Sequence, residues 1–325
     1  MINKEIGGYL EIERNYGKEF YSSIALNTSR NCLQLLVREK KIKRLYLPYY
    51  LCLVIEETCI SENIEIIYYH INNSFEPILD SVVLKENDYI YIVNYFGMLS
   101  CKYIKALKDK YKNIILDNTH SFYISPLAGV DTIYNCRKYF GVPDGAYLIS
   151  DLDINNIDKQ YEEADSLSRI KHLFGRFQKD AESFYEDFFY SECELDNNDI
   201  MLMSKITHNM LCSIDYDRVY NSRVENYDIL AKKLKDINLL KINKIGTYMY
   251  PLLVNNGKKL REYLINNKIY VPKLWPNLDK FELNDFESSL FENLIPLPID
   301  QRYSESDMNI ILKTIKEFLE LESEM

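Results

Sequence analysis

The first half of the chain alternates short apolar runs with stretches in which apolar residues recur at helical spacing. The apolar runs predict strands at residues 44–47, 64–69, 88–95, 114–116, 132–134 and 146–150. Helical spacing predicts helices at 32–38, 51–59 and 102–112. Because strands that alternate with helices are typical of βαβ units, we expect a mostly parallel sheet flanked by helices. Ligands of such sheets bind at the carboxyl ends of the strands.

The second half has a different pattern. Residues 151–200 are acidic, aromatic and helical in character, and 206–240 predict one long helix or a broken pair. Strands at 247–254 and 269–271, a helix at 258–267 and a closing helix at 305–321 are expected to follow. We therefore predict a large α/β domain over residues 1–205 and a smaller C-terminal α+β domain over residues 206–325.

Composition limits the possible functions. With 39 basic and 49 acidic residues the net charge is −10, which argues against general binding of nucleic acid. We find no signal peptide and no apolar run that could span a bilayer, so we expect a cytoplasmic protein with reduced cysteines and no membrane contact. His70, His172 and His208 lack metal-ligand spacing, and no metal is predicted. Neither GxGxxG nor GxxxxGK[ST] occurs among only 10 glycines, which excludes these two phosphate loops.

Three segments place polar residues where a ligand could bind. Asp117 ends an apolar strand, Lys138 follows another strand among aromatic residues, and Thr28 and Ser29 open a helix whose free N–H groups could bind phosphate. Taken singly, each segment has an ordinary reading as well. They could be a turn-forming aspartate, a surface lysine and a helix N-cap.

The order of these segments resembles that of fold-type-I enzymes dependent on pyridoxal 5′-phosphate (PLP), most of all the DegT-type nucleotide-sugar aminotransferases. The resemblance rests, in chain order between about residues 22 and 150, on LNTSRNCL, LYLPYYLC, VNYFGM, DNTHSF and CRKYFGVPDGA. It continues more loosely through RVENY, LWP and LPIDQRY. The resemblance implies the fold-type-I architecture, with a large domain built on a mostly parallel sheet and a smaller C-terminal α+β domain.

The resemblance also implies roles for single residues. Lys138 would form the Schiff base with PLP and move the proton during transamination, Asp117 would pair with the pyridine nitrogen, and His120 would lie near the phenolic oxygen or the ring. These three are the predicted catalytic residues. The remaining cofactor-binding residues implied are Thr28, Ser29, Arg30 and Asn135 at the phosphate, and Cys52, or Tyr50 or Tyr95 instead, at the ring face. Ser29 stands where the family commonly has glycine, and Asn135 stands where it usually has serine.

The function implied is transfer of an amino group from glutamate or glutamine to a nucleotide-linked keto sugar for surface polysaccharide synthesis. By family habit the active unit is a homodimer with its sites at the interface. Two alternatives stay open: a PLP-fold sugar dehydratase or lyase, and a non-catalytic PLP-fold binding protein. A dehydratase variant of the family has histidine in place of the lysine, so Lys138 favours amino transfer.

Overall fold

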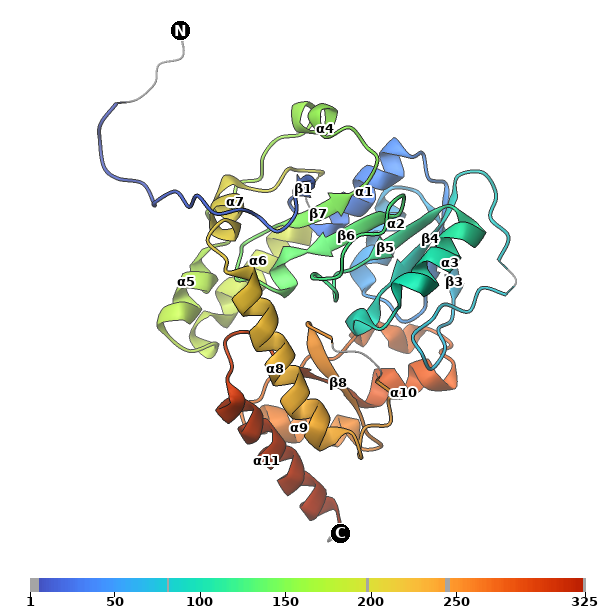
Figure 1. The fold of residues 1–325 in the computed structure, drawn as a ribbon, viewed down its shortest axis with the longest axis vertical. Helices are drawn as coiled ribbons and strands as arrows, with labels where there is room; N and C mark the ends of the chain where they lie inside the picture. The colour runs from blue at the N-terminus through green and yellow to red at the C-terminus, as the bar shows by residue number, and fades with distance from the viewer. Residues whose placement is uncertain (1–5, 81, 197–198, 243–245, 324–325) are drawn as a thin grey trace.

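A computed structural model describes residues 6–80, 82–196, 199–242 and 246–323. Within these residues a seven-stranded sheet organises the first half of the chain (Figure 1). Its strands are β1 (Ile24–Leu26), β2 (Arg44–Pro48), β3 (Glu65–Tyr69), β4 (Asp88–Val93), β5 (Ile114–Asp117), β6 (Asp131–Asn135) and β7 (Ala146–Ile149). The spatial order is β1-β7-β6-β5-β4-β2-β3, and β7 alone runs antiparallel to its neighbours. The predicted mostly parallel sheet is confirmed.

Helices cover the sheet on both faces. The helices of the first two-thirds of the chain are α1 (Ser29–Glu39), α2 (Leu53–Ser61), α3 (Cys101–Tyr111), α4 (Ile154–Gln160), α5 (Lys171–Gln178), α6 (Tyr185–Asp196) and α7 (Lys205–Leu211). Helices α1 and α2 pack together on one face, whereas α3 lies on the other (Figure 1). Connections between parallel strands are right-handed. The chain moves in one direction across the sheet from β1 to β3 and in the opposite direction from β3 to β5. The helices that connect the strands in these two parts therefore lie on opposite faces.

A second, two-stranded antiparallel sheet lies in the last third of the chain. Its strands are β8 (Met249–Leu253) and β9 (Leu294–Pro298), and its helices are α8 (Tyr216–Leu234), α9 (Gly257–Asn266), α10 (Asp285–Asn293) and α11 (Glu305–Ser323). This part of the chain has a hydrophobic cluster of its own, whose buried members include Leu230, Leu252, Leu297 and Phe318. The exact division of the chain at 205 and 206 stays a prediction.

Most predicted elements are present, and the differences have local causes. The 206–240 segment is a broken pair, because α7 ends at Leu211 and Asp215 caps the start of α8. The strand predicted at 269–271 is wrong, since these residues form no ladder. The sequence pattern also misses β1 and β9. The three residues of β1 are too few to show an alternation of apolar and polar positions. Strand β9 contains prolines at 296 and 298, which are unusual within a strand, so its sequence does not predict one.

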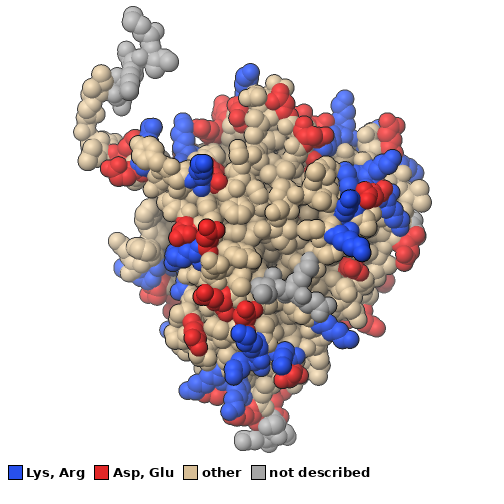
Figure 2. Space-filling model, in the orientation of Figure 1, with Lys and Arg blue, Asp and Glu red and all other residues tan. Residues whose placement is uncertain are grey.

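Charge of both signs is spread over the surface. In Figure 2, Lys and Arg side chains intermingle with Asp and Glu, and uncharged residues occupy much of the middle of the view. Within the described part of the chain, no helix is long and apolar enough to cross a membrane.

Candidate active site

The predicted site residues gather at one edge of the large sheet. Strands β1, β2, β4, β5 and β6 run in the same direction, so their carboxyl ends meet at this edge. Asp117 is the last residue of β5 and Asn135 the last residue of β6. Thr28 follows β1 and Cys52 follows β2. The topology therefore brings together residues that are up to 110 positions apart, from Thr28 to Lys138.

The N-terminus of α1 has the form of an anion site. The Thr28 hydroxyl accepts a hydrogen bond from the Asn31 N–H at 3.1 Å and so caps the helix. Ser29 is the first helical residue, with no left-handed backbone angle, so glycine is not required there. The N–H groups of Ser29 and Arg30 have no hydrogen-bond partner among the described residues, which leaves them free to bind an anion.

Asn135 faces this helix terminus from the end of β6. Its side-chain amide donates a hydrogen bond to the Ser29 hydroxyl oxygen at 3.0 Å. Its Oδ1 atom is buried and has no partner in the part of the chain that is described. A buried acceptor without a partner is costly, so the position is suited to a ligand or water that donates a proton.

Asp117 is a buried carboxylate that accepts hydrogen bonds from Tyr91 and from both the backbone and the side chain of Thr119. Tyr91 donates its hydroxyl proton to Oδ2 at 2.9 Å, and the Thr119 N–H donates to Oδ1 at 2.8 Å. Burial raises the pKa of Asp117 above its ordinary value, and the hydrogen bonds from Thr119 and Tyr91 and the nearby Lys138 offset only part of that rise. The carboxylate is thus prepared to face a cation.

Lys138 lies in the short 3-10 turn that follows β6, Cys136–Lys138. The residue remains exposed to solvent, yet protein surrounds its amine closely enough that desolvation, together with the neighbouring Arg137, lowers its pKa. Arg137 itself pairs with Glu192 of α6. A lysine with a lowered pKa that solvent can reach is suited to nucleophilic amine chemistry.

His120 is buried and stacked. Its ring lies parallel to that of Tyr248, with centroids 4.2 Å apart and an angle of 16° between the planes. Burial, with Lys138 nearby, lowers the pKa of His120 to about 3, so the imidazole is neutral at physiological pH. Its Nδ1 atom has no hydrogen-bond partner among the described residues.

The three candidates for the ring-stacking position differ in exposure. Tyr50 and Tyr95 are fully buried, and the Tyr95 hydroxyl donates to the Tyr50 carbonyl. Cys52 is half-buried and lies within electrostatic range of Lys138, Asp117 and Arg30. Of the three, Cys52 is therefore the one placed among the other site residues.

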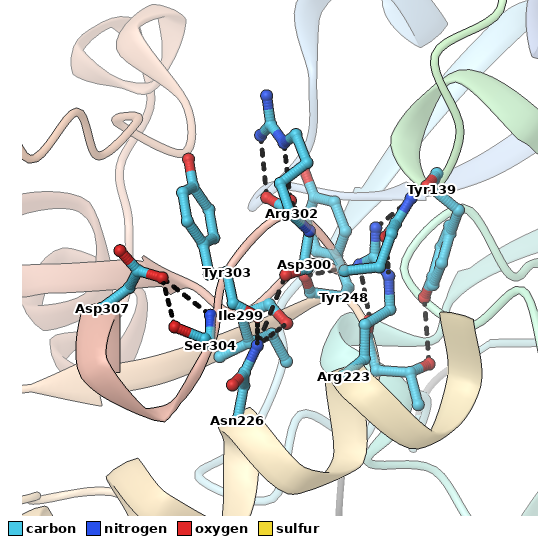
Figure 3. Close-up of polar contacts among 12 residues, drawn as sticks. Tyr139, Arg223, Asn226, Tyr248, Ile299, Asp300, Arg302, Tyr303, Ser304 and Asp307 are labelled. Atoms are coloured by element: carbon cyan, nitrogen blue, oxygen red, sulfur yellow. Dashed lines mark hydrogen bonds and ion pairs between the residues drawn. The ribbon is translucent and has the colours of Figure 1, made fainter. Parts of the chain in front are cut away.

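Arg223, on α8, ties the smaller sheet to the turn that carries Lys138 (Figure 3). Its guanidinium donates to the Tyr139 carbonyl at 3.0 Å, to the Thr247 carbonyl at 2.8 Å and to the Gln301 side chain at 2.9 Å. Gln301 also donates to the Tyr139 carbonyl, at 2.9 Å. The sequence pattern assigns Arg223 no role, although it begins the RVENY motif.

The residues fit PLP. The free N–H groups of α1 suit its phosphate, the Asp117 carboxylate suits a protonated pyridine nitrogen, and the Lys138 amine suits its aldehyde. The unpaired Oδ1 of Asn135 and Nδ1 of His120 are further polar atoms that lack partners within the described ranges. Among the described residues, no group of three or more His, Cys, Asp or Glu side chains could hold a metal ion.

Comparison with known proteins identifies the fold. No family model matches the sequence, and no curated protein matches it. Solved structures do match. An aminotransferase of the DegT DnrJ EryC1 StrS type from Brucella abortus is 14% identical, with a TM-score of 0.63 over 92% of this chain and 86% of that chain.

Two further structures are similar to the same extent. The sugar aminotransferase CalS13 from Micromonospora echinospora is 13% identical, with a TM-score of 0.63 over 90% of this chain and 86% of that one. NtdA from Bacillus subtilis, solved with bound cofactor PMP, is 12% identical, with a TM-score of 0.63 over 91% of this chain and 73% of that one. The chain thus has the fold of these aminotransferases, as predicted from its sequence.

Proposed function

We propose that this protein is a PLP-dependent aminotransferase that moves an amino group from glutamate or glutamine to a nucleotide-linked keto sugar. One observation carries the proposal: Lys138, with a lowered pKa, lies at the same sheet edge as the buried Asp117 carboxylate and the free N-terminus of α1. The structural neighbours support it, since two of them are named as aminotransferases, one of these a sugar aminotransferase, and a third holds PMP. The role in surface polysaccharide synthesis rests on the sequence resemblance alone.

Each residue then has a task. When bound, PLP supplies an aldehyde that reacts with amines and a ring that accepts electrons. The Lys138 amine would hold the cofactor through its aldehyde, and the same amine would serve as the group that moves a proton at the substrate carbon. Asp117 would hold a proton on the ring nitrogen, because a buried carboxylate is most stable beside a cation. The free N–H groups of Ser29 and Arg30 would bind the phosphate, and Asn135 would orient the Ser29 hydroxyl beside it.

Trapping with borohydride tests the assignment of Lys138. Wild-type protein incubated with PLP and reduced with borohydride should carry a phosphopyridoxyl group on Lys138, detected by peptide mass spectrometry. The adduct should vanish in Lys138→Ala and persist in Lys102→Ala, which removes an exposed lysine at the start of α3. Wild-type protein without an adduct would contradict the proposal and favour a non-catalytic binding protein.

The reaction type needs a second measurement. Glutamate added to the PLP-loaded protein should convert the cofactor to its amine form, and nucleotide-linked keto sugars should then yield an amino sugar detectable by mass spectrometry. Loaded protein that releases ammonia or water without forming an amino sugar would instead be a lyase or dehydratase.

We also propose that two copies of the chain assemble through the hairpin of α5 and α6. This hairpin lies against the site, through the pair between Glu192 and Arg137. Its exposed aromatic side chains are Phe174, Phe177, Tyr185, Phe188, Phe189 and Tyr190. At roughly 200 Å² for a fully exposed aromatic side chain, they offer about 700 Å², close to the ~800 Å² that each partner of a standard interface buries.

Light scattering during gel filtration tests this assembly. Wild-type protein should elute with twice the mass of one chain, and the double variant Phe177→Asp/Phe189→Asp with the mass of one. The control Ile310→Asp alters a similarly exposed apolar residue on α11. It should still elute with twice the mass of one chain. A monomeric wild type would overturn the proposal.

A further inference from the structure

The Tyr91 hydroxyl contacts Asp117, although Tyr91 lies in no motif that the function uses. In the ladder between β4 and β5, Tyr91 is opposite Ile115 and Val93 is opposite Asp117. Tyr91 and Asp117 are therefore diagonal neighbours on one face of the sheet, a spacing that an aromatic side chain can bridge. The hydroxyl reaches Oδ2 at 2.9 Å.

The surroundings fix Tyr91 in place. Its side chain is fully buried, and its carbonyl accepts a hydrogen bond from the Tyr69 hydroxyl at 2.7 Å. A phenylalanine would fill nearly the same volume without the polar atom. Packing of the apolar core therefore does not require the hydroxyl. Its hydrogen bond to Asp117 is the contact that a phenylalanine could not make.

The donors to Asp117 leave room for one more. The Thr119 N–H binds Oδ1 at 2.8 Å and the Tyr91 hydroxyl binds Oδ2. The Thr119 side chain is a further donor. Because the two carboxylate oxygens have four lone pairs in all, one more hydrogen bond can still be accepted. In a buried pair of a carboxylate and a pyridine nitrogen, the proton can reside on either partner, and hydrogen bonds to the carboxylate stabilise its charged form.

We propose that Tyr91 is a positioning residue that holds the Asp117 carboxylate ionised and aimed, so that the proton shared with a bound pyridine ring stays on the ring nitrogen. This inference rests on the proposed function. One proton is shared between the Asp117 carboxylate and the ring nitrogen, and no other bond forms or breaks. Removal of the hydroxyl makes the carboxylate more basic and draws the proton from nitrogen toward oxygen.

Nitrogen NMR on the loaded protein tests the inference directly. PLP labelled with ¹⁵N in the ring is bound to wild type, to Tyr91→Phe and to the control Tyr134→Phe, a buried tyrosine of β6 whose hydroxyl donates to the Ile124 carbonyl. The ring nitrogen of Tyr91→Phe should shift toward the unprotonated position, and the dissociation constant of PLP should rise about tenfold, as expected for loss of a hydrogen bond to a charged group. The control should match wild type in both measurements.

A second variant covers the case in which Tyr91→Phe fails to fold. Incorporation of 3-fluorotyrosine at position 91 keeps the shape and the hydroxyl but makes it a stronger donor, so the nitrogen should shift toward the protonated position. Unchanged nitrogen shifts in both variants would overturn the role of Tyr91. Failure of wild type itself to bind PLP would instead overturn the proposed function, so the two failures are distinguishable.

Discussion

The Asn135 side-chain amide donates a hydrogen bond to the Ser29 hydroxyl at 3.0 Å, across the N-terminus of α1. Both residues depart from the sequence pattern of the family that the chain resembles, which commonly has glycine at the position of Ser29 and serine at the position of Asn135. The structure shows that the two departures are in contact. A hydroxyl is thus still present at this terminus, carried by the helix instead of by the strand.

This contact predicts that the two side chains act as a unit. Ser29→Ala and Asn135→Ala should each weaken PLP binding about fivefold, and the double variant little more than either, because neighbours in one hydrogen-bond network are not additive. Titration of apo-protein with PLP, followed by absorbance, measures the effect. Ser100→Ala is the matched control, since it removes the cap hydroxyl of α3, which lies on the other face of the sheet from α1 (Figure 1). Additive losses would show that the two residues act independently.

Arg223 is expected to stabilise the fold strongly. Arg223→Met leaves the Thr247 carbonyl and the Gln301 side-chain oxygen without their Arg223 donor, and the Tyr139 carbonyl with the Gln301 amide alone. The free energy of unfolding should therefore fall by about 3 kcal/mol. Urea denaturation measures it. The comparison is Arg302→Ala, whose side chain is more than half exposed in its ion pair with Asp300 and should cost less than about 1 kcal/mol. If Arg223→Met and Arg302→Ala lowered the free energy of unfolding equally, the stabilising role of Arg223 would be contradicted.

The lowered pKa of His120 predicts how the free energy of unfolding depends on pH. Its pKa is lowered to about 3 in the folded state, against about 6.5 in the unfolded chain. Below pH 6.5 the unfolded chain takes up a proton that the folded protein does not, so the free energy of unfolding falls as pH falls through this window. Urea denaturation of apo-protein should show His120→Gln losing about 2 kcal/mol less than wild type between pH 6.5 and pH 5. Parallel profiles would show that His120 titrates normally.

Much of the large sheet could be predicted because its signals are local. The run Ile114–Asp117 is apolar and ends in a carboxylate, and the helix that begins at Ser29 follows a cap residue. Strand β9 could not be found in this way, because its two prolines are unusual in a strand and its pairing with β8 joins residues about 45 positions apart. Its existence depends on a partner that the local pattern does not reveal.

The sequence by itself determined the order of most strands and helices of the large sheet, the polar residues at the strand ends and hence the edge at which they meet. Only the tertiary structure decided which side chains touch there: Tyr91 with Asp117, Asn135 with Ser29, and His120 with Tyr248. The physical reason is that periodicity reports which face of an element is buried, whereas a contact depends on the register and packing of elements distant in the chain. The same reason explains why Arg223, which joins the smaller sheet to the turn of Lys138, became apparent only in three dimensions.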